Sequence, residues 1–174
     1  MNEIKVKIRR IHPDAVIPQY ATELAAGFDL VAVEDVIIAP GETALVPTGI
    51  AVEIPPGYEM QVRPRSGVSL RTKLRVANSP GTIDADFRGE VKVIVDNSAR
   101  EEHGSTPRLR NLEGKTEFYN GEYFEKYTSI IRKGDRIAQA VIAPIMRATF
   151  EIADELTGTE RGSSGLGHTG VRAC

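Results

Sequence analysis

Two segments of the chain combine arginine, serine and glycine in a way that suits phosphate binding. Residues 63–67 read RPRSG and place two arginines and a serine at a turn. Residues 161–170 read RGSSGLGHTG, and their glycines would let backbone N–H groups approach an anion closely. Each segment also carries the fixed positive charge of arginine. Taken alone, a basic surface turn and a flexible terminus are the simpler interpretations of these two segments.

An acidic turn within residues 78–90 could supply a general base. Asp84 and Asp86 would share one face if the backbone there is extended. A carboxylate aimed into a pocket can orient or deprotonate a water molecule. The apolar neighbours Ile83 and Phe87 suggest a pocket wall, whereas a polar hairpin with solvated carboxylates is the competing interpretation.

Two further segments carry polar residues at turns. Residues 25–30 read AAGFDL, and residues 133–139 read KGDRIAQ before an apolar run. A structural role is the default for each of them alone. Elsewhere the sequence excludes several chemistries: one cysteine and three scattered histidines cannot form a typical zinc site, and there is no glycine-lysine-serine phosphate loop.

Composition sets limits on the environment and the partners. The net charge of −2 argues against broad electrostatic binding to nucleic acid or to an anionic membrane. The single cysteine allows no disulfide framework within the chain, which fits a reducing compartment. No apolar stretch approaches the length that spans a membrane. We therefore expect a cytoplasmic protein without nucleic-acid or membrane partners.

The elements that must position these residues have a hydrophobic period of two. Residues 4–8 alternate apolar and lysine side chains, residues 90–95 place three valines on one face, and residues 44–54 and 136–145 are also β-like. Glycine and proline turns interrupt the chain often, which is typical of a sandwich, jelly roll or barrel. Helix signals are weak: we predict one short helix after Ser66 and another near residues 99–103.

Residues 98–128 break this pattern. The segment is charged and has no clean period, yet it contains five of the ten phenylalanine and tyrosine residues of the chain. A disordered linker would be poor in aromatic residues. We expect the segment to be ordered at least in part, at the surface and outside the catalytic centre. Its aromatic side chains need a dry surface, which is the flank of the domain, a neighbouring subunit or a separate protein partner. We favour packing within a trimer.

Considered together and in order, five segments resemble the five motifs of the homotrimeric dUTPase family: residues 26–30, 64–67, 81–89, 134–139 and 161–167. The resemblance implies an all-β jelly roll with little helix and a homotrimer with active sites at subunit interfaces. It implies one β domain over residues 1–160, with an insertion at 98–128, and a glycine-rich, swapped C-terminal arm over 161–174. The implied activity is Mg²⁺-dependent hydrolysis of dUTP to dUMP and pyrophosphate.

The resemblance also implies a role for individual residues. Asp84 positions the water that attacks the α-phosphorus and also contacts the 3′-hydroxyl, and Asp29 contacts Mg²⁺ through water. The phosphates are held by Arg65, Ser66, Gly67 and Gln139. The nucleoside is bound by Asn78, Gly81, Thr82, Ile83 and Phe87, and Lys92 aligns with a further substrate-contact position. The arm closes over the triphosphate with Arg161, Gly162, Ser163 and Leu166.

The chain departs from the family pattern at two positions besides the insertion. Phe87 stands where the family often has tyrosine, so the ring that faces the deoxyribose is kept. Leu166 stands where an aromatic residue is usual and offers no ring to stack on uracil. Two alternatives remain: a relative of dCTP deaminase, which would have a second serine where this chain has Gly67, and a dUTPase scaffold with an added protein-binding role through residues 98–128.

Overall fold

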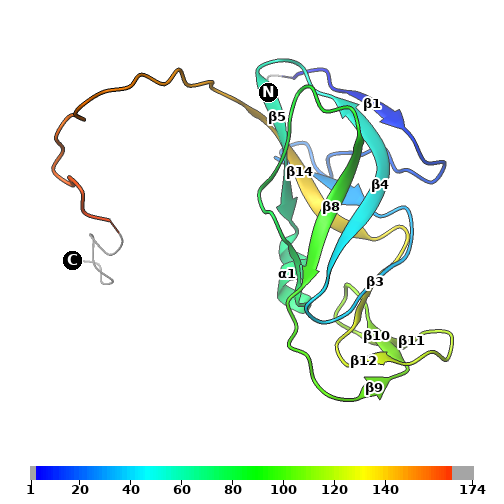
Figure 1. Ribbon diagram of the computed structural model, residues 1–174. Helices are drawn as coiled ribbons and strands as arrows, with labels where there is room; N and C mark the ends of the chain where they lie inside the picture. Colours follow the sequence, from blue (N-terminus) through cyan, green and yellow to red (C-terminus); the bar gives the residue numbers. More distant parts are fainter. Residues whose placement is uncertain (1–2, 166–174) are drawn as a thin grey trace.

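Two antiparallel sheets face each other across the hydrophobic core in the computed structural model, which describes residues 3–165 (Figure 1). The first sheet has the strand order β1 (Lys7–Arg10), β4 (Thr43–Glu53), β8 (Glu90–Asn97) and β6 (Leu74–Val76). The second has the order β2 (Phe28–Val31), β14 (Arg136–Pro144), β5 (Tyr58–Pro64) and β7 (Gly81–Ile83). The predicted all-β fold with little helix is confirmed.

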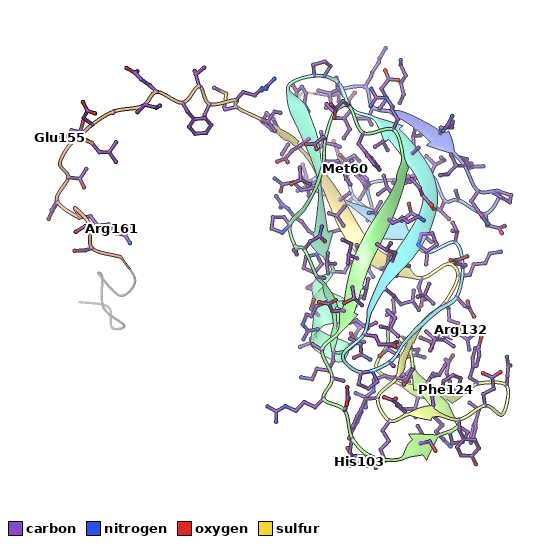
Figure 2. All side chains as sticks on the ribbon, viewed as in Figure 1. Met60, His103, Phe124, Arg132, Glu155 and Arg161 are labelled. Carbon is purple, nitrogen blue, oxygen red and sulfur yellow. The ribbon has the colours of Figure 1, made fainter. Side chains whose placement is uncertain are left out.

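The strand predicted from the period of two in residues 90–95 contributes side chains to this core. Val91, Val93 and Val95 of β8 are buried, because alternate side chains of a strand point to the same face. The opposite sheet contributes Met60 and Leu30, each about 1% exposed (Figure 2 marks Met60). Side chains from both sheets form one continuous apolar cluster.

A third sheet ties residues 98–128 to the sandwich (Figure 1, lower part). Its order is β11 (Thr116–Phe118), β10 (Arg108–Arg110), β13 (Ser129–Ile131) and β3 (Val36–Ile38). A separate two-stranded ribbon joins β9 (Ser105–Thr106) and β12 (Phe124–Glu125). Leu109 on β10 is fully buried, so the segment packs on the flank of its own domain.

The aromatic residues of this segment divide into two kinds. Tyr119 and Phe124 pack edge to face, with ring centroids 5.8 Å apart. Phe118 and Tyr123 are 65% and 70% exposed in the single subunit. Their packing within an oligomer therefore remains a prediction, whereas Tyr119 and Phe124 already find partners inside their own chain.

The structure confirms one of the two predicted helices. α1 (Ser66–Arg71) begins after the extended residue Arg65, as the turn at residues 63–67 predicted. The helix predicted near residues 99–103 is wrong, because those residues have no regular structure. Five residues are too few to nucleate a helix without tertiary support. Glu102 instead pairs with Lys126 at 2.7 Å, which holds that stretch against the ribbon of β9 and β12.

The chain leaves the sandwich after β14 as an extended arm (Figures 1 and 2). The arm carries four large apolar side chains that are at least 90% exposed in the single subunit: Met146, Phe150, Ile152 and Leu156. No helix of residues 3–165 is long and apolar enough to cross a membrane.

Candidate active site

A polar cleft of about 310 Å³ lies where β2, β5, α1 and β14 meet. Its volume is in the range of small-molecule binding sites. Eight residues line it: Ala21, Gly27, Asp29, Arg65, Ser66, Gly67, Arg136 and Gln139. The cleft thus brings together five of the predicted site residues, which come from three segments far apart in the sequence.

Strand register explains this convergence. β14 lies between β2 and β5, and its residue Gln139 is directly opposite Asp29 on one side and Arg63 on the other. The Gln139 amide Nε2 donates a hydrogen bond to the carbonyl oxygen of Pro64 at 2.8 Å. This bond holds the end of β5, from which the chain turns through Arg65 into α1.

A tight turn over residues 132–135 positions the start of β14 at the cleft. The Arg132 backbone N–H donates to the Asp135 carboxylate at 2.8 Å, and the Asp135 N–H donates back to the Arg132 carbonyl at 2.9 Å. Gly134 has a φ of +89°, a conformation that side-chain-bearing residues rarely adopt. Burial raises the pKa of Asp135 against the opposing effect of its bond from Arg132. The turn ends at Arg136, the first residue of β14.

The electrostatic centre of the cleft is Asp29 between two arginines. Its Oδ1 lies 2.8 Å from Nε of Arg65, and its Oδ2 lies 3.4 Å from Nη1 of Arg136. Arg65 also donates from Nη1 to the Arg136 carbonyl at 3.1 Å. Two guanidinium groups and one carboxylate leave a formal charge of +1, so the cleft favours an anion.

Gly27 makes room for this arrangement. A Cβ atom at its position would lie 3.0 Å from the Ala140 carbonyl oxygen and 3.2 Å from the Gln139 side-chain oxygen. Both contacts are tighter than ordinary van der Waals distances. The absence of a side chain at Gly27 therefore lets β14 and Gln139 approach closely enough to line the cleft.

A second group of predicted residues lies at the acidic turn, outside this cleft. Gly81, Thr82 and Ile83 form β7, which pairs with β5, and Asp84 follows directly. The Phe87 N–H donates to the Asp84 carbonyl at 3.1 Å and closes the turn, leaving the Asp84 side chain exposed. Asn78 packs against Gly81, where a Cβ atom would lie 3.0 Å from its Nδ2.

The remaining predicted residues lie elsewhere. Lys92 is on β8 and pairs with Glu90 at 3.4 Å. Arg161 is on the arm, where its guanidinium donates to the carbonyls of Ser164 at 3.0 Å and Gly165 at 3.3 Å (Figure 2). Gly162 and Ser163 belong to the same turn. Leu166 lies outside the described residues. Within one subunit, the predicted site residues therefore form separate groups.

Sequence reasoning missed Arg136 as a residue of the cleft. It lies inside the candidate segment 133–139, three positions before Gln139. Alternation along a strand puts residues two apart on one face, so Arg136 and Gln139 would be expected on opposite faces. The register of β14 against β2 shifts between Arg136 and Ala138, and this irregularity places both side chains at the cleft.

Comparisons with known proteins agree with this geometry. A family model described as dUTPase matches residues 14–103 and 119–170, and the unmatched internal stretch between them falls inside the insertion. The deoxyuridine 5′-triphosphate nucleotidohydrolase of Nautilia profundicola is 46% identical over 167 residues, which cover 96% of this chain and 99% of that protein.

Two solved structures are also similar. The Staphylococcus bacteriophage 80alpha dUTPase with dUpNHpp has a TM-score of 0.90 and 32% identity, with 96% of this chain and 99% of that chain covered. A mutant form of the dUTPase from phage phi11 of S. aureus, described with a structural Mg(II) ion, has a TM-score of 0.82 and 30% identity. The match to it covers 87% of this chain and 98% of that chain.

Proposed function

Because this chain belongs to the dUTPase family of hydrolases, we propose that it hydrolyses dUTP to dUMP and pyrophosphate by attack of water on the α-phosphorus. The bond from the α-phosphorus to the bridging oxygen breaks, and pyrophosphate leaves. The observation that carries the proposal is the cleft in which Arg65, Ser66, Gly67 and Gln139 converge beside Asp29. Its excess positive charge suits a triphosphate, and its residues come from three of the five family segments.

The phosphate-binding part of the proposal follows from donor chemistry. Arg65 has a planar fork of N–H donors, part of which is engaged by Asp29 and by a carbonyl. Ser66 supplies a hydroxyl, and Gly67 allows close approach of the backbone at the start of α1. Hydrolysis of a phosphoric anhydride needs positioning and charge neutralisation more than covalent chemistry by the protein.

The donor set of the cleft fits Mg²⁺ that is held mainly by the triphosphate. Mg²⁺ prefers six oxygen ligands and keeps several waters. Residues 3–165 contain no group of three or more side chains able to hold a metal, and the cleft contains one carboxylate, Asp29. Asp29 would contact the ion through water, with phosphate oxygens supplying the other ligands. The ion would neutralise charge that develops on the phosphates.

The catalytic water is assigned to Asp84, which lies outside the phosphate cleft of its own subunit. A complete site therefore needs surface from another chain. The exposed apolar side chains of the arm support a homotrimer in which the arm crosses to a neighbour and Arg161 covers the triphosphate. In that assembly the backbone of Gly81, Thr82 and Ile83 with Asn78 reads the uracil edge, and Phe87 packs on the deoxyribose. Lys92 would provide a further contact.

The test is a substrate panel. Pyrophosphate release is measured for dUTP, dTTP, dCTP and UTP, each with and without Mg²⁺, and ammonia release is measured in parallel. The expected result is Mg²⁺-dependent pyrophosphate release from dUTP alone. Ammonia release from dCTP would instead identify a deaminase and refute the proposed reaction.

A further inference from the structure

We propose that Arg136 is a further triphosphate-binding residue, which acts beside Arg65 and is released from Asp29 when the anion binds. The inference rests on the proposed dUTP hydrolysis and deepens it. Arg136 is the first residue of β14 and lines the cleft together with Ser66, Gly67 and Gln139. Its guanidinium could either stabilise the fold or bind a ligand, and its contacts distinguish the two roles.

The side-chain contacts of Arg136 contribute too little to stability to explain a structural role for this residue. Within residues 3–165 its side chain makes one ion pair, to Asp29 at 3.4 Å, and 61% of the side chain is exposed. The ion pair between Arg65 and Asp29 is shorter, at 2.8 Å. An exposed pair of this kind contributes little to stability. Most of the five N–H donors of Arg136 therefore remain available on the wall of an anion-attracting cleft.

Arg132, at the other end of the same turn, shows what a structural arginine looks like in this chain. Its guanidinium bonds Asp35 at 2.6 Å and Glu117 at 2.9 and 2.6 Å, and it covers the ring of Tyr119 at 4.8 Å. All three of its nitrogens are thus in use. Arg136 lies four residues away. Its N–H donors remain available although every guanidinium nitrogen of Arg132 in the same turn is engaged, so their availability is specific to the position in the cleft.

Asp29 allows the positive charges of Arg65 and Arg136 to lie close together before an anion binds. Each of its oxygens faces one guanidinium, which offsets the repulsion between Arg65 and Arg136. A phosphate oxygen can replace the weaker of these two contacts. Because a triphosphate carries several charged oxygens and a monophosphate carries few, the contribution of a second arginine should grow with the number of phosphates.

The experiment uses the full-length protein with Arg136→Gln, Arg136→Lys and a matched control, Arg63→Gln. Arg63 lies on β5 directly opposite Gln139, but it bonds Gln61 and does not line the cleft. Binding of dUMP and of the imido analogue dUpNHpp with Mg²⁺ is measured by calorimetry. Steady-state hydrolysis of dUTP, melting temperature and molecular mass are recorded for every variant.

We expect Arg136→Gln to weaken dUpNHpp binding about 10- to 100-fold, the range for loss of a charge-assisted hydrogen bond, and to leave dUMP binding within about twofold. Arg136→Lys should recover part of the loss, because it keeps the charge without the planar fork. If Arg136→Gln does not fold, Arg136→Lys decides the matter through the same ratio of the two ligands. Arg63→Gln should match the wild type.

Two results would overturn the inference. Equal behaviour of Arg136→Gln and Arg63→Gln would show that Arg136 does not bind phosphate. An equal loss for dUMP and dUpNHpp would show that Arg136 acts only by holding Asp29 and Arg65 in place. A wild-type protein that does not hydrolyse dUTP would contradict the proposed function itself, which is a separate outcome.

Discussion

Arg132 and Glu117 are joined by two hydrogen bonds to one carboxylate oxygen, from Nε at 2.9 Å and from Nη2 at 2.6 Å. Glu117 belongs to the insertion and Arg132 to the turn that leads into β14, so the bond connects the insertion to the segment that carries Arg136 and Gln139 (Figure 2 marks Arg132). No residue of 98–128 lines the cleft. The insertion therefore contacts the turn that leads into the cleft without lining the cleft itself, and we call this contact the brace.

The insertion also contacts α1, and a substitution at Leu112 tests whether this contact supports the site. Leu112 lines a small apolar cavity together with Val68 of α1, and Gly114 lies close to the Arg71 carbonyl at the end of the helix. We expect Leu112→Ala to destabilise the protein by about 1–2 kcal/mol, below the range for fully buried leucines, and to raise KM for dUTP more than it lowers kcat. Glu122→Gln, at an exposed side chain of the insertion, is the control. An unchanged KM for Leu112→Ala would contradict the brace.

The ion pairs of Arg132 predict a pH dependence of stability. The Lys133 backbone N–H and the Arg132 guanidinium hold the pKa of Asp35 below its usual range. A carboxyl whose pKa is lowered by folding stabilises the protein above its unfolded pKa of about 3.9 and loses this effect as the pH falls through the folded value. Asp35→Asn should therefore melt below the wild type at pH 7. The gap should begin to narrow as the pH falls below about 4 and should close once the pH lies below the folded pKa of Asp35. The exposed control Glu122→Gln should show no gap.

The assignment of the catalytic water predicts a sharp difference between two neighbouring carboxylates. Asp84→Asn is expected to lower kcat about 10²- to 10⁴-fold, since a positioned base is lost, and to leave dUpNHpp binding mostly intact. Asp86→Asn, two residues along the same exposed turn, should keep a kcat close to that of the wild type. Single-turnover hydrolysis with both variants separates them. Near-normal kcat in Asp84→Asn would remove Asp84 from the mechanism.

The apolar arm predicts an oligomer. Phe150 and Ile152 are almost fully exposed in the single subunit, and burying a side chain of this size contributes about 1.5–3 kcal/mol. We expect the wild type to have a trimer mass by light scattering and the double variant Phe150→Ser with Ile152→Ser to dissociate at protein concentrations where the wild type stays assembled. Glu155→Gln on the same arm is the control. An active wild-type monomer would refute the trimer.

Residues close together in sequence carried most of the correct expectations. The alternation in residues 90–95 predicted a strand because one face of a sheet is buried. The turn at residues 63–67 predicted a short helix after Ser66, and α1 begins at Ser66 itself. Local pattern failed where tertiary contacts decide the backbone. Residues 99–103 have helix-compatible side chains, but Glu102 is held by Lys126, twenty-four positions away. No local rule anticipates such a partner.

The sequence by itself determined the fold class and the family, because these depend on short motifs and on hydrophobic period. It also predicted, through the resemblance, that Arg65, Ser66, Gly67 and Gln139 hold the phosphates. Only the tertiary structure showed that these four residues line one cleft together with Arg136, and that the insertion contacts the turn at Arg132. Both facts depend on register: the irregular pairing of β14 with β2 turns Arg136 toward Asp29, and the parallel pairing of β10 with β13 sets the insertion beside the turn at Arg132. Register is set by packing between distant segments, and no single segment encodes it.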